Sequence, residues 1–135
     1  MMFVSLAGPF SNIVLAVFCG FFVRVISPSD HALLFYLFSF GVYINVALAL
    51  FNMIPIFPLD GSSILKGLVS VEMAEKISHL DRMGAFIMLG IFLVDHFLHI
   101  GILWYVLGFP IMTVVEILTQ ESFPLLQQVF IASFG

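Results

Sequence analysis

An acid, an amide and two prolines stand close together at the end of a long apolar run, in the stretch from Asn52 to Gly61. Asp60 most needs an explanation, because a charged aspartate at membrane depth costs roughly 2.5–3.5 kcal/mol on insertion scales. Acids inside membranes usually face a cavity, a polar partner or a metal ion. The stretch therefore predicts that Asp60 forms part of a binding site.

The composition places this site in an integral membrane protein. Of the 135 residues, 62% are hydrophobic and 9% are charged, and the mean hydropathy is +1.22. Soluble domains are about 45–50% apolar and about 25% charged. The length allows only a few spans of roughly 20 residues, so we predict a single membrane domain over 1–135, surrounded by the lipid bilayer. The formal net charge of −4 includes no basic cluster, which argues against nucleic acid as a partner.

Two apolar runs predict a helical hairpin at the start of the chain. The first span is expected over 10–26, with Gly8-Pro9 at the helix entrance, where the missing proline N–H costs nothing. The second is expected over 31–54, long enough to cross a hydrocarbon core of roughly 30 Å. The polar cluster 27–30 predicts a tight turn between them, and its last two residues are candidates for the cap of the second helix.

Pro55 and Pro58 end the second span, because each lacks an N–H donor and disfavours helical geometry in the preceding residue. An irregular loop is therefore predicted over 55–61, and backbone of this kind at membrane depth must be buried by protein or reached by water. The charged segment 62–82 predicts a solvated or interfacial helical connection. Of the four basic residues, only Arg24 lies outside the region 55–82, which favours the cytoplasmic side for that region.

The apolar character returns at residue 83, and the position of the next turn stays open. One alternative is a long span that ends at Gly108 and is followed by a shorter, kinked span. The other is a re-entrant hairpin that turns near His99-Gly101. The tail 124–134 is expected at the interface. In either case the sequence predicts an all-α fold, a polytopic transmembrane helical bundle of three to four spans with an irregular, proline-containing loop.

A second polar cluster interrupts this last apolar region. Asp95 and His99 are four residues apart, and His96 lies three residues before His99, so one helix face could present metal ligands. A polar cluster at the end of a span would have the same composition without binding a metal. We prefer this second interpretation.

Three short blocks carry a resemblance to a known family. Residues 7–12 read AGPFSN, residues 45–52 read NVALALFN, and residues 55–61 read PIFPLDG. In these blocks the chain resembles the site-2 protease family of intramembrane zinc metalloproteases, peptidase family M50, whose AGPxxN, NxxLALFN and PxxPLDG motifs follow in the same order. The resemblance covers residues 5–68, and residues 83–135 are expected to be scaffold.

The resemblance implies a zinc site and a reaction. The aspartate of the LDG motif is the family's third protein ligand to zinc, and its match here is Asp60. The asparagine that matches Asn52 lies near the family's active site, which implies substrate binding by Asn52 with Pro55 and Pro58. The implied function is hydrolysis of peptide bonds in transmembrane substrates by the C-terminal membrane part of a metalloprotease. The remaining motif residues are expected to be structural: Gly8, Pro9, Asn12, Asn45 and Gly61.

The amides of Asn45 and Asn52 are each expected to bond another helix or a substrate strand, because an unpaired amide in an apolar span is costly. For Asn12 and Asn45, a bond to another helix is expected at least as much as a substrate role. Gly61 is expected to let the backbone pass closely beside Asp60.

The rest of the family's zinc site is not found in this sequence. The family takes two histidine ligands and the general base from an HExxH helix, whereas none of the four histidines here is followed by glutamate. No catalytic residue is therefore assigned. Two explanations stay open: a preceding HExxH-bearing segment in a longer protein, which we favour, or a naturally short, inactive relative.

Three other interpretations use the same residues. Asp60 could cap a helix that begins at Ser62, in a turn favoured by Pro58 and Gly61. A non-catalytic membrane protein could use the same fold to bind transmembrane partners. A small channel or transporter could use Asp60 and Asp95 as acids of an ion pathway, although no motif supports it.

Overall fold

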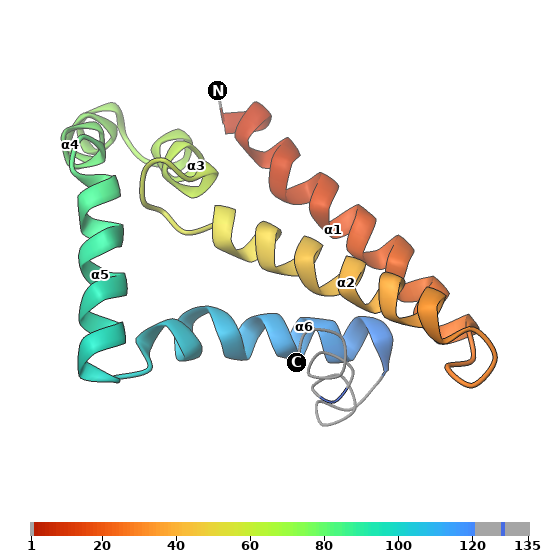
Figure 1. Cartoon of the computed structure of the whole chain (residues 1–135). Helices are drawn as coiled ribbons and strands as arrows, with labels where there is room; N and C mark the ends of the chain where they lie inside the picture. Colours follow the sequence, from red (N-terminus) through yellow and green to blue (C-terminus); the bar gives the residue numbers. More distant parts are fainter. Residues whose placement is uncertain (1, 121–127, 129–135) are drawn as a thin grey trace.

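A computed structural model describes residues 2–120 and 128, and all regular elements within these residues are helical (Figure 1). This confirms the predicted all-α class. The predicted interfacial tail, 124–134, lies outside the described residues except at position 128. The elements in chain order are α1 (Met2–Val25), α2 (Ala32–Asn52), α3 (Asp60–Leu68), α4 (Val71–Asp81), α5 (Gly84–Leu98), the π-helical turn η1 (Trp104–Gly108) and α6 (Phe109–Thr119).

The first two helices form the predicted antiparallel hairpin and pack side by side (Figure 1). Both are long and apolar enough to cross a membrane. The cap predicted at Ser29 or Asp30 is wrong, because the Asp30 N–H donates to the Ser27 carbonyl and keeps Asp30 inside the turn. The cap position falls to His31, whose carbonyl accepts the first helical bond from the Phe35 N–H, at 3.0 Å.

The helix entrance predicted at Gly8-Pro9 is also wrong, since α1 begins at Met2 and continues through Pro9. A proline inside a helix loses one backbone hydrogen bond. Apolar membrane helices tolerate this loss where neighbouring helices pack closely, and Pro9 is buried. Gly8 and Pro9 therefore lie within the first span and not at its start.

The core of the described chain lies where α6 packs against the hairpin. Buried apolar side chains from all three helices meet there: Ala16 and Val23 from α1, Phe35, Val42 and Val46 from α2, and Ile111 and Val115 from α6. Glycines let the backbones approach, as is common where membrane helices pack. A Cβ on Gly20 would lie 3.0 Å from the Leu118 carbonyl oxygen, and one on Gly41 would lie 2.8 Å from the Cys19 sulfur.

Arg24, near the end of α1, contacts the end of α6. Its Nε donates to the Leu118 carbonyl at 2.8 Å, and its Nη2 donates to the Ile117 carbonyl at 2.6 Å. The last carbonyls of a helix have no partner within the helix and carry partial negative charge. The guanidinium of Arg24 thus caps α6, a role that the sequence analysis did not predict.

The chain bends sharply in its second half. The axes of α4 and α5 meet at 62°, and the next turn follows α5, where His99 and Gly101 adopt left-handed φ values of 50° and 80°. Of the two turn positions that the sequence left open after residue 83, the structure has the one near His99-Gly101. Among the described residues, two helices are long and apolar enough to span a membrane, or three if the bent α4–α5 pair counts as one span. The protein is thus a helical membrane protein.

Candidate metal site at the start of α3

The segment between α2 and α3 has the irregular backbone that its prolines predict. Residues 53–59 form successive turns, with the Ile56 N–H bonded to the Ile54 carbonyl and the Leu59 N–H to the Ile56 carbonyl. The Phe57–Pro58 peptide bond is cis. The next helix begins at Asp60, with Leu59 as its cap residue. The alternative role of Asp60 as the cap of a helix beginning at Ser62 is therefore wrong.

Two glycines set the position of Asp60. Gly61 is buried, and a Cβ there would lie 2.3 Å from the carbonyl oxygens of both Met53 and Ile54. Only glycine lets the first turn of α3 lie this close to the end of α2. On the other side, a Cβ on Gly8 would lie 3.0 Å from Oδ2 of Asp60. The structure therefore brings residues of the first and third motif blocks into direct proximity.

The Asp60 carboxylate is available for a ligand. It is half-buried, and no side-chain hydrogen bond or ion pair holds it within the described residues. It lies in the first turn of α3, where the helix dipole favours negative charge. No cluster of three or more histidine, cysteine, aspartate or glutamate side chains gathers in the part of the chain that the structure describes. This region thus offers one oxygen ligand, and a catalytic zinc site needs three protein ligands.

The residues that the motifs imply for substrate binding lie at the end of α2 and in the loop between α2 and α3. Asn52 is the last residue of α2 and is half-buried, and Pro55 and Pro58 follow on the exposed side of the loop. Asn12 is half-buried, one helical turn after Gly8. The bond predicted from Asn45 to another helix is wrong, because its Nδ2 donates to the Gly41 carbonyl of the same helix at 2.8 Å. A carbonyl one turn earlier in α2 is the nearest acceptor, and it satisfies the amide locally.

A second acid near the site was missed by the sequence analysis. Asp81, the last residue of α4, accepts a hydrogen bond from Ser62 Oγ at 2.6 Å and one from Lys66 Nζ at 2.5 Å. Burial would raise the pKa of the Asp81 carboxyl, but both hydrogen bonds and the Lys66 charge outweigh burial and lower this pKa. Lys66 and Asp81 are 15 residues apart, so no local spacing rule connects them.

The other polar cluster has a structural geometry. The Asp95 carboxylate accepts from the Ile102 N–H at 2.6 Å and from the Leu103 N–H at 3.3 Å, across the turn between α5 and η1. The rings of His96 and His99 lie 6.4 Å apart, and that of His96 also stacks on Phe92. Both oxygens of Asp95 accept hydrogen bonds from backbone N–H groups. This geometry therefore favours the interpretation as a polar cluster that binds no metal.

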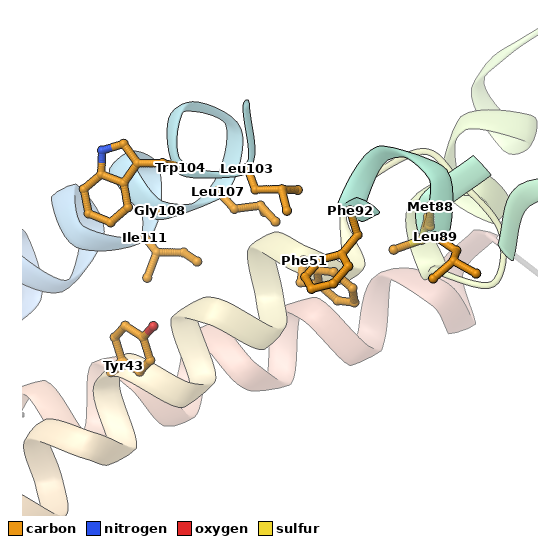
Figure 2. Close-up of a pocket in the computed structure, with 10 residues that line it drawn as sticks. All are labelled: Tyr43, Phe51, Met88, Leu89, Phe92, Leu103, Trp104, Leu107, Gly108 and Ile111. Atoms are coloured by element: carbon orange, nitrogen blue, oxygen red, sulfur yellow. The ribbon is translucent and has the colours of Figure 1, made fainter. Parts of the chain in front are cut away.

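An apolar groove lies between α2 and the later helices α5, η1 and α6 (Figure 2). The groove is open on one side, has a volume of about 680 Å³, and is lined almost wholly by apolar and aromatic residues of α2, α5, η1 and α6. None of the residues expected at the zinc or substrate site contributes to it. The lining residues are Tyr43, Phe51, Met88, Leu89, Phe92, Leu103, Trp104, Leu107, Gly108 and Ile111.

Comparison with known proteins identifies the family. The profile of peptidase family M50 matches residues 23–94. "Putative zinc metalloprotease YwhC" of Bacillus subtilis (strain 168) is 31% identical over 131 residues, which cover 91% of this chain and 58% of that relative. "Putative zinc metalloprotease MJ0611" of Methanocaldococcus jannaschii is 43% identical over 63 residues, which cover 47% of this chain and 32% of that relative. No solved structure matches this chain.

The chain belongs to peptidase family M50, as its motif blocks predict. The matched profile extends from the end of α1 to α5 and includes Asn52, the proline loop and Asp60. The alignment covers little more than half the length of the Bacillus relative, 58%, and a third, 32%, of the archaeal one.

Proposed function

We propose that this chain is the C-terminal membrane part of a zinc metalloprotease that hydrolyses peptide bonds of transmembrane substrates, and that Asp60 is its zinc ligand. The observation that carries the proposal is the half-buried Asp60 carboxylate, which has no bonding partner among the described side chains. Acids next to membrane spans that have no protein partner are candidates for a metal ion or another polar ligand. Membership of family M50 and the names of both relatives support zinc as that ligand.

The residues present fit one ligand position of such a site. A carboxylate oxygen is an accepted zinc ligand, and the missing side chain of Gly8 leaves room beside Oδ2 of Asp60. We propose that the two histidine ligands and the general base come from an HExxH segment outside this chain. Zinc, when bound, supplies Lewis-acid polarisation of the scissile carbonyl and activation of water.

The end of α2 and the loop after it are proposed to receive the substrate. A substrate helix must unwind locally, because its carbonyls are engaged in helical hydrogen bonds. Asn52 lies where α2 itself ends, and an amide offers both donors and an acceptor to an unwound strand. Pro55 and Pro58 keep the neighbouring backbone out of the helical conformation. We place this corner, with the rest of 55–82, on the cytoplasmic side from the distribution of basic residues.

The test compares wild type, Asp60→Asn and Asp30→Asn in the complete protein, with zinc content and cleavage of a transmembrane test substrate as readouts. Asp30 is an exposed acid in the turn between α1 and α2, so its amide variant is a matched control. We expect Asp60→Asn to lose zinc and to reduce cleavage about 100-fold or more, because a lost ligand removes several kcal/mol of stabilisation. Wild-type zinc content and activity in Asp60→Asn would refute the ligand assignment.

The apolar groove favours one alternative, a non-catalytic protein that binds transmembrane partners. Its volume of about 680 Å³ and its aromatic lining suit apolar side chains of another helix. A native product of this length that retained its membrane partner and bound no zinc would favour this alternative over the protease.

A further inference from the structure

The corner between α4 and α5, residues 81–84, contacts both α3, which begins with Asp60, and the proline loop before it. Oδ1 of Asp81 accepts from Ser62, and Oδ2 accepts from Lys66. Ser62 and Lys66 are four residues apart, so they lie on one face of α3. One carboxylate therefore holds two successive turns of the helix that begins with Asp60.

The same corner also supports the proline loop. Gly84, the first residue of α5, is buried, and a Cβ there would lie 2.3 Å from the carbonyl oxygen of Phe57. The start of α5 thus lies directly against the loop backbone, three residues after Asp81 in sequence. Movement of this corner would shift α3 and the loop together.

The hydrogen bond from Ser62 acts close to Asp60. Ser62 is 1% exposed and lies two residues after Asp60, in the first turn of α3. This helix has only nine residues, and short helices depend on tertiary contacts for their stability. Rotation of α3 about its axis would break the bond from Ser62 to Asp81 and would move the Asp60 carboxylate away from Gly8.

We propose that Asp81 is a positioning residue, which clamps α3 through Ser62 and Lys66 so that the Asp60 carboxylate is held in the orientation that zinc binding requires. This inference rests on the proposed function, because it takes Asp60 as a zinc ligand. Groups that orient metal ligands typically affect metal affinity 10–100-fold. Asp81 acts through the helix and not through a bond to Asp60, so we expect an effect of about tenfold, at the lower end of this range.

The test uses the complete protein and compares Asp81→Asn with Glu72→Gln. Glu72 is an exposed acid on the same helix, paired with Lys76 at 3.4 Å, and provides a matched change from acid to amide. Zinc affinity is measured by competition with a chelator, the absorption spectrum of the Co²⁺-loaded protein reports ligand geometry, and thermal unfolding identifies folded protein. We expect Asp81→Asn to lower zinc affinity about tenfold and to alter the Co²⁺ spectrum, and Glu72→Gln to match wild type.

A milder variant covers the case in which Asp81→Asn fails to fold. Ser62→Ala removes one of the two hydrogen bonds and leaves the Lys66–Asp81 pair intact. Loss of one hydrogen bond predicts a decrease in zinc affinity of about threefold. Wild-type zinc affinity and an unchanged Co²⁺ spectrum in folded Asp81→Asn or, if that variant does not fold, in Ser62→Ala would overturn the positioning role.

Asp60→Asn separates the two proposals. If Asp60→Asn loses zinc while folded Asp81→Asn binds zinc as wild type does, the positioning role fails and the ligand assignment stands. If Asp60→Asn keeps wild-type zinc affinity, the ligand assignment fails and the positioning role fails with it.

Discussion

Two polar turns interrupt the apolar helices, one between α5 and η1 and one between α2 and α3. Each has an aspartate beside it, and the two carboxylates differ in their hydrogen bonding. At the turn between α5 and η1, both oxygens of Asp95 accept backbone N–H groups. At the corner between α2 and α3, Gly61 lets the backbone pack closely, and the Asp60 carboxylate has no hydrogen bond or ion pair within the described residues. The first acid stabilises the fold, whereas the second is left available for a ligand. The two acids therefore differ in whether the surrounding backbone already occupies their oxygens.

The strongest test of this contrast is Gly61→Ala. A Cβ at Gly61 would lie 2.3 Å from two carbonyl oxygens, whereas one at Gly90 in α5 would meet no atom within 4 Å. We expect Gly61→Ala to lower the free energy of unfolding by about 3 kcal/mol or more, because backbone atoms cannot move aside as side chains can. Gly90→Ala should be neutral or stabilising by up to about 1 kcal/mol. Thermal unfolding of both variants in detergent would measure this difference, and equal stability would contradict the close packing at Gly61.

The second test removes the acid that stabilises the fold. Asp95→Ala leaves the Ile102 and Leu103 N–H groups without their acceptor, and we expect it to destabilise the protein by about 2 kcal/mol. Asp95→Asn keeps one acceptor oxygen and should cost about half as much. Zinc affinity per folded molecule should remain at the wild-type value in both variants. A loss of zinc without a loss of stability would instead assign Asp95 to a metal site.

A third test reduces the space beside the available acid. Gly8→Ala would place a Cβ 3.0 Å from Oδ2 of Asp60, so the carboxylate would have to shift by a few tenths of an ångström. We expect zinc affinity to fall about tenfold, which corresponds to about 1.4 kcal/mol. Gly90→Ala serves again as the control, and chelator competition is the measurement. Unchanged zinc affinity in Gly8→Ala would show that the orientation of Asp60 toward Gly8 does not matter for binding.

The smallest expected effect is the pH dependence of the Asp81 contact. The pKa of Asp81 is lowered from its ordinary value of 3.8 in the folded protein, so the contact stabilises the fold fully at pH values above 3.8 and is lost as the pH falls through the folded pKa. We expect a contribution of under about 1 kcal/mol. The difference in unfolding temperature between wild type and Asp81→Asn should therefore shrink below pH 4. A constant difference from pH 6 to pH 3 would contradict the ionised pair.

Local sequence patterns predicted the helical hairpin and the loop after it, because their causes are local. A long apolar run defines each span, and Pro55 and Pro58 exclude a regular helix wherever the chain is folded. The end of the apolar run and the motif blocks both pointed to Asp60, and its role as a zinc ligand stays a prediction. The exact ends of helices were less predictable, as Pro9 shows, since tertiary packing lets a proline remain inside α1.

Contacts between distant residues could not be predicted from one sequence. Asp81 was classed with the charged residues of the connection, because nothing in the spacing indicates that it meets Ser62 and Lys66. The groove between α2, α5, η1 and α6 could not be predicted either, since every apolar residue in a membrane span is compatible with lipid contact. For the turn after α5, the sequence left two positions open. The chain turns near His99-Gly101, and Asp95 accepts the Ile102 and Leu103 N–H groups across this turn.

The contact between Arg24 and α6 has a consequence for biogenesis. Its two acceptors, the carbonyls of Ile117 and Leu118, lie 93 and 94 residues further along the chain. Because a ribosome delivers the chain from its N-terminus, the hairpin of α1 and α2 emerges well before these acceptors exist. This contact between α1 and α6 therefore forms late in assembly, after the last described helix has been made.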